Sequence, residues 1–297
     1  MLARHLSSER RANKLRAAFG QYLSPQLVEA LARDPDRLRL GGEERDMTFL
    51  FTDLEGFTSF TEAVEPALLV STLNAYLDGV CAIAMDNGGT IDKIVGDAVH
   101  VMFNAPLDQP DHAARAVRCG LAIDVFSQAF AADAARHAAA GRAFGTTRIG
   151  INTGRAVVGN FGGRRRFDYT AHGDAINTAA RLEAANKRLG TRICVAGTTV
   201  EAVGPGSQLR FRPIGSLGLK GKTKSVAVFA PSVADGPETA WADRYGDAFA
   251  RLSRGDEDGP DAIMALLVQY PDDPLLRFHA ERIARGLRGT DLPLQAA

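Results

Sequence analysis

Two aspartates in the sequence have neighbours that suit metal binding. Asp53 directly follows an apolar, β-branched segment, Met47 to Thr52, and Asp97 lies in the turn of a β-rich hairpin 44 residues further along the chain. If that segment pairs with the hairpin, both carboxylates reach one end of a sheet, where the Leu54 carbonyl adds a third oxygen. Hard oxygen ligands of this kind suit Mg²⁺ or Mn²⁺ bound together with substrate phosphates.

The spacing alone is also typical of two turn-forming aspartates, because Asp is common at strand ends. The neighbouring glycines favour the metal interpretation. Gly56 follows the first aspartate and Gly96 precedes the second, so the backbone can fold closely around an ion at both places.

A phosphate site also needs positive charge, and the sequence offers several cations. Lys93 lies in the same hairpin as Asp97, and Lys220 lies between two glycines in GLKGKTK. Arg181 follows Asn177 by four residues, so the two project from one face of a helix and could stabilise charge on a ribose oxygen and a phosphoryl group. Each of these residues could equally be a solvated surface residue. The same holds for the basic run 164–166 and for Glu183, which follows Arg181 on the same predicted helix.

Other chemistries find little support in the sequence. The motif of a P-loop and that of a hydrolase nucleophile elbow are both absent. Three widely separated cysteines and six scattered histidines have no ligand or disulfide spacing, so a reducing compartment is expected. A formal net charge of zero over 297 residues argues against a general nucleic-acid or anionic-membrane binder. No apolar run of about 18 residues is present, so no segment of this chain is expected to contact a membrane.

The elements that must position these residues follow from hydrophobic periodicity. A strand over Met47–Thr52 precedes a long helix whose buried face includes Leu69, Leu73 and Leu77. The order strand, helix, hairpin, helix, strand predicts an α+β protein with a ferredoxin-like, or palm, βαββαβ core. The remaining expected elements are a hairpin over 90–95 and 98–103, a helix over 111–140, a strand pair over 148–152 and 156–158, a flexible basic hairpin tip near 161–169, a helix over 174–189, and strands near 191–195, 209–213 and 225–230.

The two ends of the chain differ from this core in composition. Residues 1–43 are expected to form linker helices, with a helix start at Ser24-Pro25 and a loop at Gly41-Gly42. Residues 232–297 contain three amphipathic segments separated by glycine and proline, and they predict a small helical extension.

Four separated motifs resemble the catalytic domain of class III nucleotide cyclases. They are FTDLEGFTSF, DKIVGDAVHVMF, YTAHGDAINTAARLE and LKGK, in this order, and the resemblance covers residues 44–231. The segment FGQYLSPQLVEAL is also similar to the linker that precedes many bacterial adenylate cyclase domains.

The resemblance implies a role for each candidate residue. Asp53 and Asp97 would hold two divalent cations, Mg²⁺ or Mn²⁺, with help from the Leu54 carbonyl, whereas Glu55 matches a variable loop position. The other implied roles are purine selection by Lys93 and Thr170, ribose orientation by Asn177, stabilisation of phosphoryl charge by Arg181, and phosphate contacts from Lys220 and Arg165, with Arg164 and Arg166 as alternatives to Arg165.

The implied activity is conversion of ATP to 3′,5′-cyclic AMP and pyrophosphate by a head-to-tail homodimer with shared sites. The Lys93 ammonium can only donate, which suits the acceptor N1 of adenine and opposes the N1–H of guanine. Guanylate cyclase activity and a catalytically silent nucleotide-sensing dimer are the alternatives. Such a domain is expected in the cytoplasm, either free or as the cytoplasmic portion of a membrane-anchored protein with an upstream sensor.

Overall fold

The computed structural model describes residues 40–137, 144–163, 165–219, 224–233 and 239–293. Its strands form one sheet in the order β2-β3-β1-β4-β6-β8-β7-β9, and β5 pairs with β4 outside this path. The expected helices over residues 1–39 lie outside the described residues.

The first half of the described chain is the predicted ferredoxin-like core. Strands β1 (Gly41–Leu54), β2 (Thr90–Val95), β3 (Ala98–Phe103) and β4 (Thr147–Gly163) lie in the order β2-β3-β1-β4, and every neighbouring pair is antiparallel. Helix α4 (Pro66–Asp86) connects β1 to β2, and α5 (His112–His137) connects β3 to β4. This order confirms the predicted fold class.

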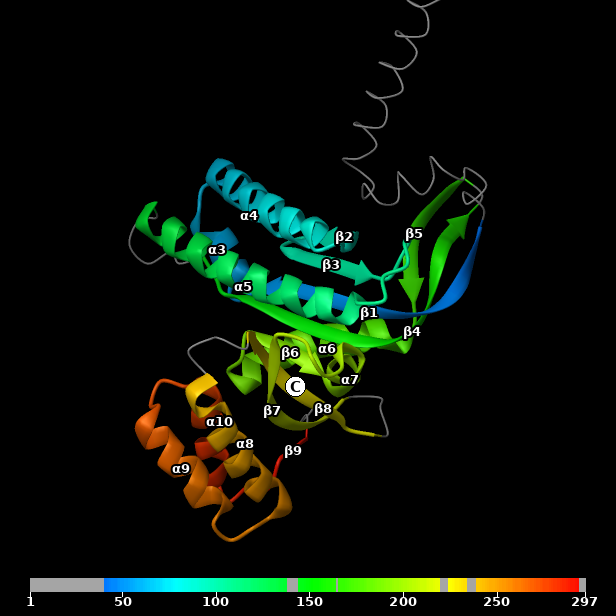
Figure 1. Ribbon diagram of the computed structural model, residues 1–297. Coiled ribbons are helices and arrows are strands. Elements are labelled where there is room, and N and C mark those ends of the chain that lie inside the picture. The colour runs from blue at the N-terminus through cyan, green and yellow to red at the C-terminus, as the bar shows by residue number, and fades with distance from the viewer. Residues whose placement is uncertain (1–39, 138–143, 164, 220–223, 234–238, 294–297) are drawn as a thin grey trace, which may run out of the picture.

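Helices cover both faces of the core sheet, as Figure 1 shows. On one face, Leu50 and Ile151 pack in a cluster with residues of α4 and α5. On the other, Phe49 and Phe51 pack in a cluster with the first half of α6 (Asp174–Leu189). Because side chains alternate along a strand, Asp53 lies on the same face as Phe51, which is the α6 face.

Helix α4 is the one helix among the described residues that is long and apolar enough to cross a membrane, by length and composition alone. Three of its residues, Tyr76, Val80 and Ala84, are buried in the core cluster that α4 shares with α5. Packing inside the domain therefore accounts for the apolar character of this face of the helix.

The boundaries of two strands differ from the sequence prediction. Gly41 and Gly42, expected in a loop, begin β1 and pair with residues 159–160 of β4. Residues 147–163 form one continuous strand, whereas the sequence predicted a break at Thr153-Gly154. The hairpin partner of β4 is β5 (Arg166–His172), so the turn falls near the predicted basic tip. Thr153-Gly154 is a local turn signal, but pairing of these two residues with Thr48 and Met47 of β1 overrides that local preference.

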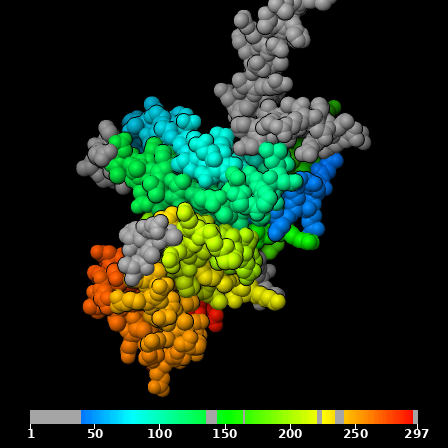
Figure 2. Space-filling view, viewed as in Figure 1, coloured from blue at the N-terminus to red at the C-terminus, as the bar shows by residue number. Residues whose placement is uncertain are grey.

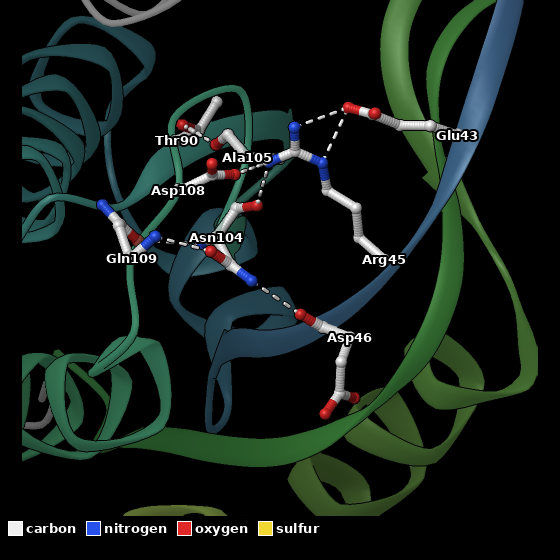
Figure 3. Close-up of polar contacts among 8 residues, drawn as sticks. All are labelled: Glu43, Arg45, Asp46, Thr90, Asn104, Ala105, Asp108 and Gln109. Carbon is white, nitrogen blue, oxygen red and sulfur yellow. Dashed lines mark hydrogen bonds and ion pairs between the residues drawn. The ribbon is translucent and has the colours of Figure 1, made fainter.

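The loop that follows β3 is fixed to the start of β1 by a polar network (Figure 3). The Asn104 backbone N–H donates to the Gln109 side chain at 2.9 Å, and the Gln109 N–H donates to the Asn104 side chain at 2.6 Å. The Asn104 amide also donates to the Asp46 carbonyl, and Arg45 donates to the Asn104 carbonyl. These contacts fix the loop from which α5 starts, at the opposite end of β3 from Asp97.

The second half of the described chain extends the sheet and adds a helical layer. Strands β6 (Ile193–Ala196), β7 (Leu209–Gly218), β8 (Val226–Val233) and the three-residue β9 (Asp291–Pro293) follow β4 in the sheet. Helices α8 (Thr239–Arg254), α9 (Gly259–Gln269) and α10 (Pro274–Ala284) lie close to the three predicted segments, and the short helices α3 (Phe57–Ala63) and α7 (Gly197–Val203) complete the set.

The C-terminal helices share one core with the sheet. Leu182 and Leu189 of α6, Ile214 of β7 and Leu276 of α10 belong to a single buried cluster. In Figure 2 the C-terminal residues, in orange, lie directly against the yellow and yellow-green residues that precede them. Strand β9, which no sequence pattern indicated, pairs with β7 and joins this extension to the sheet.

Candidate active site

The ends of β1 and of the β2–β3 hairpin bring Asp53 and Asp97 together, as the sequence predicted. The Leu54 N–H donates to Asp97 Oδ2 at 2.9 Å, which places the Asp97 carboxylate beside the residue that follows Asp53. Gly96 has φ of 63°, a left-handed conformation that lets the hairpin turn present Asp97. Burial and the nearby Asp53 charge raise the pKa of Asp97, and the Leu54 N–H opposes this rise.

Two residues that sequence reasoning did not assign to the site lie against Asp53. Arg148 of β4 is the cross-strand partner of Asp53 and forms an ion pair with its carboxylate. The Nε of Arg148 donates to Glu183 Oε1 at 3.1 Å. The side chains of Arg148 and Glu183 are each only 15% exposed, so the interpretation of Glu183 as ordinary helix surface was wrong.

The ionisation of Glu183 reflects its crowded surroundings. Burial and the negative charge of Asp53 raise the pKa of Glu183 to about 7, although Arg148 acts in the opposite direction. Burial alone would lower the pKa of Arg148, but its two carboxylate partners raise it overall. Arg148 therefore stays cationic between two acids.

The donor set fits a divalent cation held jointly by protein and substrate. Within the described part of the chain, no three His, Cys, Asp or Glu side chains group closely enough to hold a metal ion alone. Two carboxylates with a backbone carbonyl nearby match the way Mg²⁺ is usually bound, by one or two carboxylates, waters and substrate phosphates. A cation, the Arg148 guanidinium, already lies on Asp53, so this position favours positive charge.

Helix α6 also carries Asn177 and Arg181, four residues apart. Asn177 is exposed and Arg181 is partly exposed. At about 100° per residue, Arg181 and Glu183 lie about 160° apart around the helix. Because Glu183 contacts Arg148 beside Asp53, Arg181 projects away from the carboxylates of its own chain.

The two expected purine-selecting residues lie on different strands. Lys93 of β2 is exposed and pairs with His100 of β3, whose ring stacks on Phe51. Lys93 therefore lies on the α6 face. Thr170 of β5 is buried and pairs with Gly159, 11 residues along β4 from Arg148, which corresponds to about 36 Å of extended strand.

The expected phosphate-binding residues are described only in part. Lys220 and Arg164 lie outside the described residues. Arg165 and Arg166 are exposed where the β4–β5 hairpin turns.

Comparison with known proteins identifies the family. Residues 42–231 match the family model described as the adenylate and guanylate cyclase catalytic domain. The chain belongs to this family. The matched range begins at the second residue of β1.

Two relatives of this chain are adenylate cyclases from bacteria. The chain is 35% identical over 214 residues to adenylate cyclase 1 of Rhizobium meliloti and 30% identical over 224 residues to an adenylate cyclase of Anabaena cylindrica. These matches cover 71% and 73% of this chain, but only 31% and 44% of the relatives' own lengths.

Two solved cyclase structures match at the same level of identity. The adenylyl cyclase CyaB from P. aeruginosa has a TM-score of 0.59 at 32% identity, covering 65% of this chain and 96% of its own. The guanylyl cyclase Cya2 has a TM-score of 0.56, also at 32% identity, covering 67% of this chain and 97% of its own. One of these structures is titled an adenylyl cyclase and the other a guanylyl cyclase, so the similarity does not decide between ATP and GTP. The choice of purine must be argued from the site itself.

Proposed function

We propose that this cyclase converts ATP to 3′,5′-cyclic AMP and pyrophosphate at the interface of a head-to-tail homodimer. The observation that carries the proposal is the meeting of Asp53 and Asp97 beside the Leu54 backbone. The names of the bacterial adenylate cyclase relatives support the reaction.

In this proposal the reaction is an intramolecular displacement. The ribose 3′-oxygen forms a bond to the α-phosphorus, the bond from that phosphorus to the bridging oxygen of pyrophosphate breaks, and the 3′-hydroxyl proton is released. Two divalent cations, Mg²⁺ or Mn²⁺, supply charge neutralisation and a lowered pKa of the 3′-hydroxyl when bound. Asp53, Asp97 and the Leu54 carbonyl would hold these ions.

The remaining residues position the substrate. Asn177 orients the ribose, and Arg181 donates to the phosphoryl oxygens as their charge increases. Lys220 and Arg165 contact the phosphates. Positioning and charge stabilisation supply most of the rate enhancement.

Selection of adenine rests on Lys93 and Thr170. The Lys93 ammonium donates to adenine N1, and Thr170 can both donate and accept. With guanine the ammonium would face another donor, and leaving one buried donor unpaired costs about 1–3 kcal/mol. The alternative, guanylate cyclase activity, is supported by the equal match to a guanylyl cyclase but is opposed by this lysine.

The shared site follows from the orientation of α6. Because Arg181 projects away from the carboxylates of its own chain, a second protomer is needed to complete each site. The β2–β3 hairpin also exposes two apolar side chains beside Lys93, Ile94 at 50% and Val95 at 56%. Exposed apolar residues next to a functional lysine favour a protein contact at this place. The second alternative, a silent nucleotide-sensing dimer, is disfavoured because the sequence contains every expected residue.

Replacing either Asp53 or Asp97 by Ala is expected to reduce cyclic AMP formation below detection, because each carboxylate is needed to hold the metal ions. Formation of cyclic AMP from ATP with Mn²⁺ is the measurement. The matched control is Glu55→Gln, since Glu55 is an exposed acid two residues from Asp53 and is expected to retain full activity. Near wild-type turnover in both aspartate variants would refute the metal assignment.

Mixing two inactive variants tests the shared site. Asp53→Ala and Arg181→Ala, combined and allowed to exchange protomers, are expected to recover about a quarter of wild-type activity, since about half of the dimers are mixed and each mixed dimer has one intact site of two. Absence of recovery, with mixed dimers demonstrated by two different affinity tags, would contradict the dimeric site.

A further inference from the structure

The guanidinium of Arg148 lies between two acids at the edge of the proposed metal site. It pairs with Asp53 on one side and donates to Glu183 at 3.1 Å on the other. The exposed fractions of these side chains are 15% for Arg148, 32% for Asp53 and 15% for Glu183. Charges this poorly exposed to water interact more strongly than exposed ones.

The fold brings these three residues together from separate elements. The register of β1 on β4 places Asp53 directly opposite Arg148, so the two side chains share one face of the sheet. Gly150, two residues along the same face, lets α6 approach closely: a Cβ added there would lie 2.2 Å from the Glu183 backbone nitrogen. This close packing is what allows Glu183 to reach Arg148.

The charges of the cluster are consistent with replacement of one cation by another. Asp53, Asp97, Glu183 and Arg148 together provide three carboxylates and one guanidinium, a formal charge of −2 when all are ionised. Without a metal ion, Arg148 is the cation that neutralises Asp53. When a divalent cation binds Asp53, Glu183 is the carboxylate that remains to pair with Arg148.

We propose that Arg148 and Glu183 are positioning residues that control access to the metal site, and this inference rests on the proposed metal assignment. Arg148 holds the Asp53 carboxylate until a divalent cation binds, and Glu183 then retains the displaced guanidinium. Arg148 thus competes with metal binding, whereas Glu183 favours it by withdrawing Arg148 and by adding negative charge. A purely structural ion pair would predict no such opposite effects.

The test is Mn²⁺ binding to the full chain saturated with 3′-deoxy-ATP, a nucleotide that cannot cyclise. Binding is measured by calorimetry, with the nucleotide alone as the blank. Arg148→Gln is expected to bind Mn²⁺ about tenfold more tightly, because it removes a close and partly buried competing cation. Glu183→Gln is expected to bind about tenfold more weakly for the opposite reason. Arg148→Lys keeps the positive charge, so its affinity for Mn²⁺ should remain near that of the wild type. The double variant Arg148→Gln/Glu183→Gln loses both opposing effects, so its affinity should also lie near the wild-type value.

Two controls separate the outcomes. Arg155→Gln removes an exposed arginine of the same strand, paired with Glu44 at 3.4 Å, and should leave Mn²⁺ affinity unchanged. If Asp53→Ala abolishes Mn²⁺ binding but Arg148→Gln and Glu183→Gln both keep wild-type affinity, the metal site stands and the present inference is overturned. If Asp53→Ala binds Mn²⁺ as the wild type does, the metal assignment and the inference both fail. Should Arg148→Gln not fold, the weaker Mn²⁺ binding expected of Glu183→Gln still decides the question: wild-type affinity in Glu183→Gln would overturn the inference.

Discussion

The two carboxylates at the end of β1 are held by different kinds of partner. Asp97 accepts a backbone N–H from Leu54, so its position depends on the backbone of β1 and of the hairpin turn at Gly96. Asp53 instead pairs with the Arg148 side chain, whose charge must be displaced or shared when another cation arrives. Of the two acids, Asp53 is therefore the one whose availability to a metal ion depends on neighbouring side chains.

Lys93 is the residue on which purine preference depends. Lys93→Ala is expected to lower the preference for ATP over GTP by about tenfold or more, because the donor that opposes guanine N1–H is lost. The ratio of kcat/KM for the two nucleotides is the measurement. Lys187, an exposed lysine in the last turn of α6, supplies the control, and Lys187→Ala should leave this ratio unchanged. An unchanged ratio in Lys93→Ala would remove Lys93 from the purine site.

At the residue scale, the site residues that could be predicted from the sequence are those whose positions follow from local signals. Asp53, Leu54 and Asp97 could be placed together because a strand end and a hairpin turn have recognisable local signals. Arg148 and Glu183 could not, because their meeting with Asp53 requires the register of β1 on β4 and the close approach of α6. Glu183 follows Arg181 by only two residues, yet the two lie on different sides of one helix.

The approach of α6 to β4 depends on a residue with no side chain. Gly150→Ala would place a Cβ 2.2 Å from both the Ala179 carbonyl oxygen and the Glu183 nitrogen. Both neighbours are backbone atoms, so the helix must shift, and the expected loss of stability is about 3 kcal/mol. The midpoint of urea unfolding is the measurement.

Gly246 of α8 provides the matched comparison for Gly150. A Cβ added there has no neighbour within 4 Å, so Gly246→Ala is expected to stabilise the protein by about 0.5–1 kcal/mol through helix propensity. If both alanine variants unfold at the same urea concentration as the wild type, close packing of α6 on β4 is not what positions Glu183.

The C-terminal helices place a histidine fully inside their core. His279 of α10 is 0% exposed, and neither ring nitrogen has a hydrogen-bond partner among the described residues. Burial, together with the charges of Arg282 and Arg212, lowers the pKa of His279 to about 4, although Asp273 acts in the opposite direction. His279 is therefore neutral in the folded protein at neutral pH.

This depressed pKa makes stability depend on pH in a defined direction. The contribution of neutral His279 to the free energy of unfolding is complete above pH 6.5, the ordinary pKa of histidine in the unfolded chain. This contribution is lost as the pH falls toward about 4. Between pH 7 and pH 4 the wild type should therefore lose about 3 kcal/mol more unfolding free energy than His279→Leu. Urea unfolding at several pH values measures this difference, and replacement of the exposed His172 of β5 by Leu is the control. Parallel pH profiles for the wild type and His279→Leu would contradict the account.

Most elements could be predicted from hydrophobic periodicity, and the failures have a common cause. The bounds of α6 agree with its amphipathic pattern, because the buried face of a helix appears in the sequence as apolar residues every three or four positions. The predicted break within β4 and the unexpected β9 depend instead on partners far along the chain. Residues 153–154 of β4 are paired with β1, and β9 is paired with β7. Strand formation at such places is decided by pairing and not by local composition.

At the scale of the whole molecule, the proposed function requires a site that a single chain would leave incomplete. Asp53 and Asp97 lie where β1 ends, whereas Thr170 of β5 pairs with Gly159, far along β4 from Arg148. Arg181 projects away from those carboxylates. A twofold dimer would bring each set of residues to the complementary set of the partner and form two equivalent sites. Activity should then depend on association.

The central claim is tested most directly by measuring cyclic AMP formation from ATP with Mn²⁺ as the protein is diluted, with the oligomeric state followed by sedimentation. The account predicts that activity per protomer falls as the dimer dissociates, and that GTP is converted at least about tenfold more slowly than ATP. Constant activity per protomer at concentrations where sedimentation shows only monomer would contradict it.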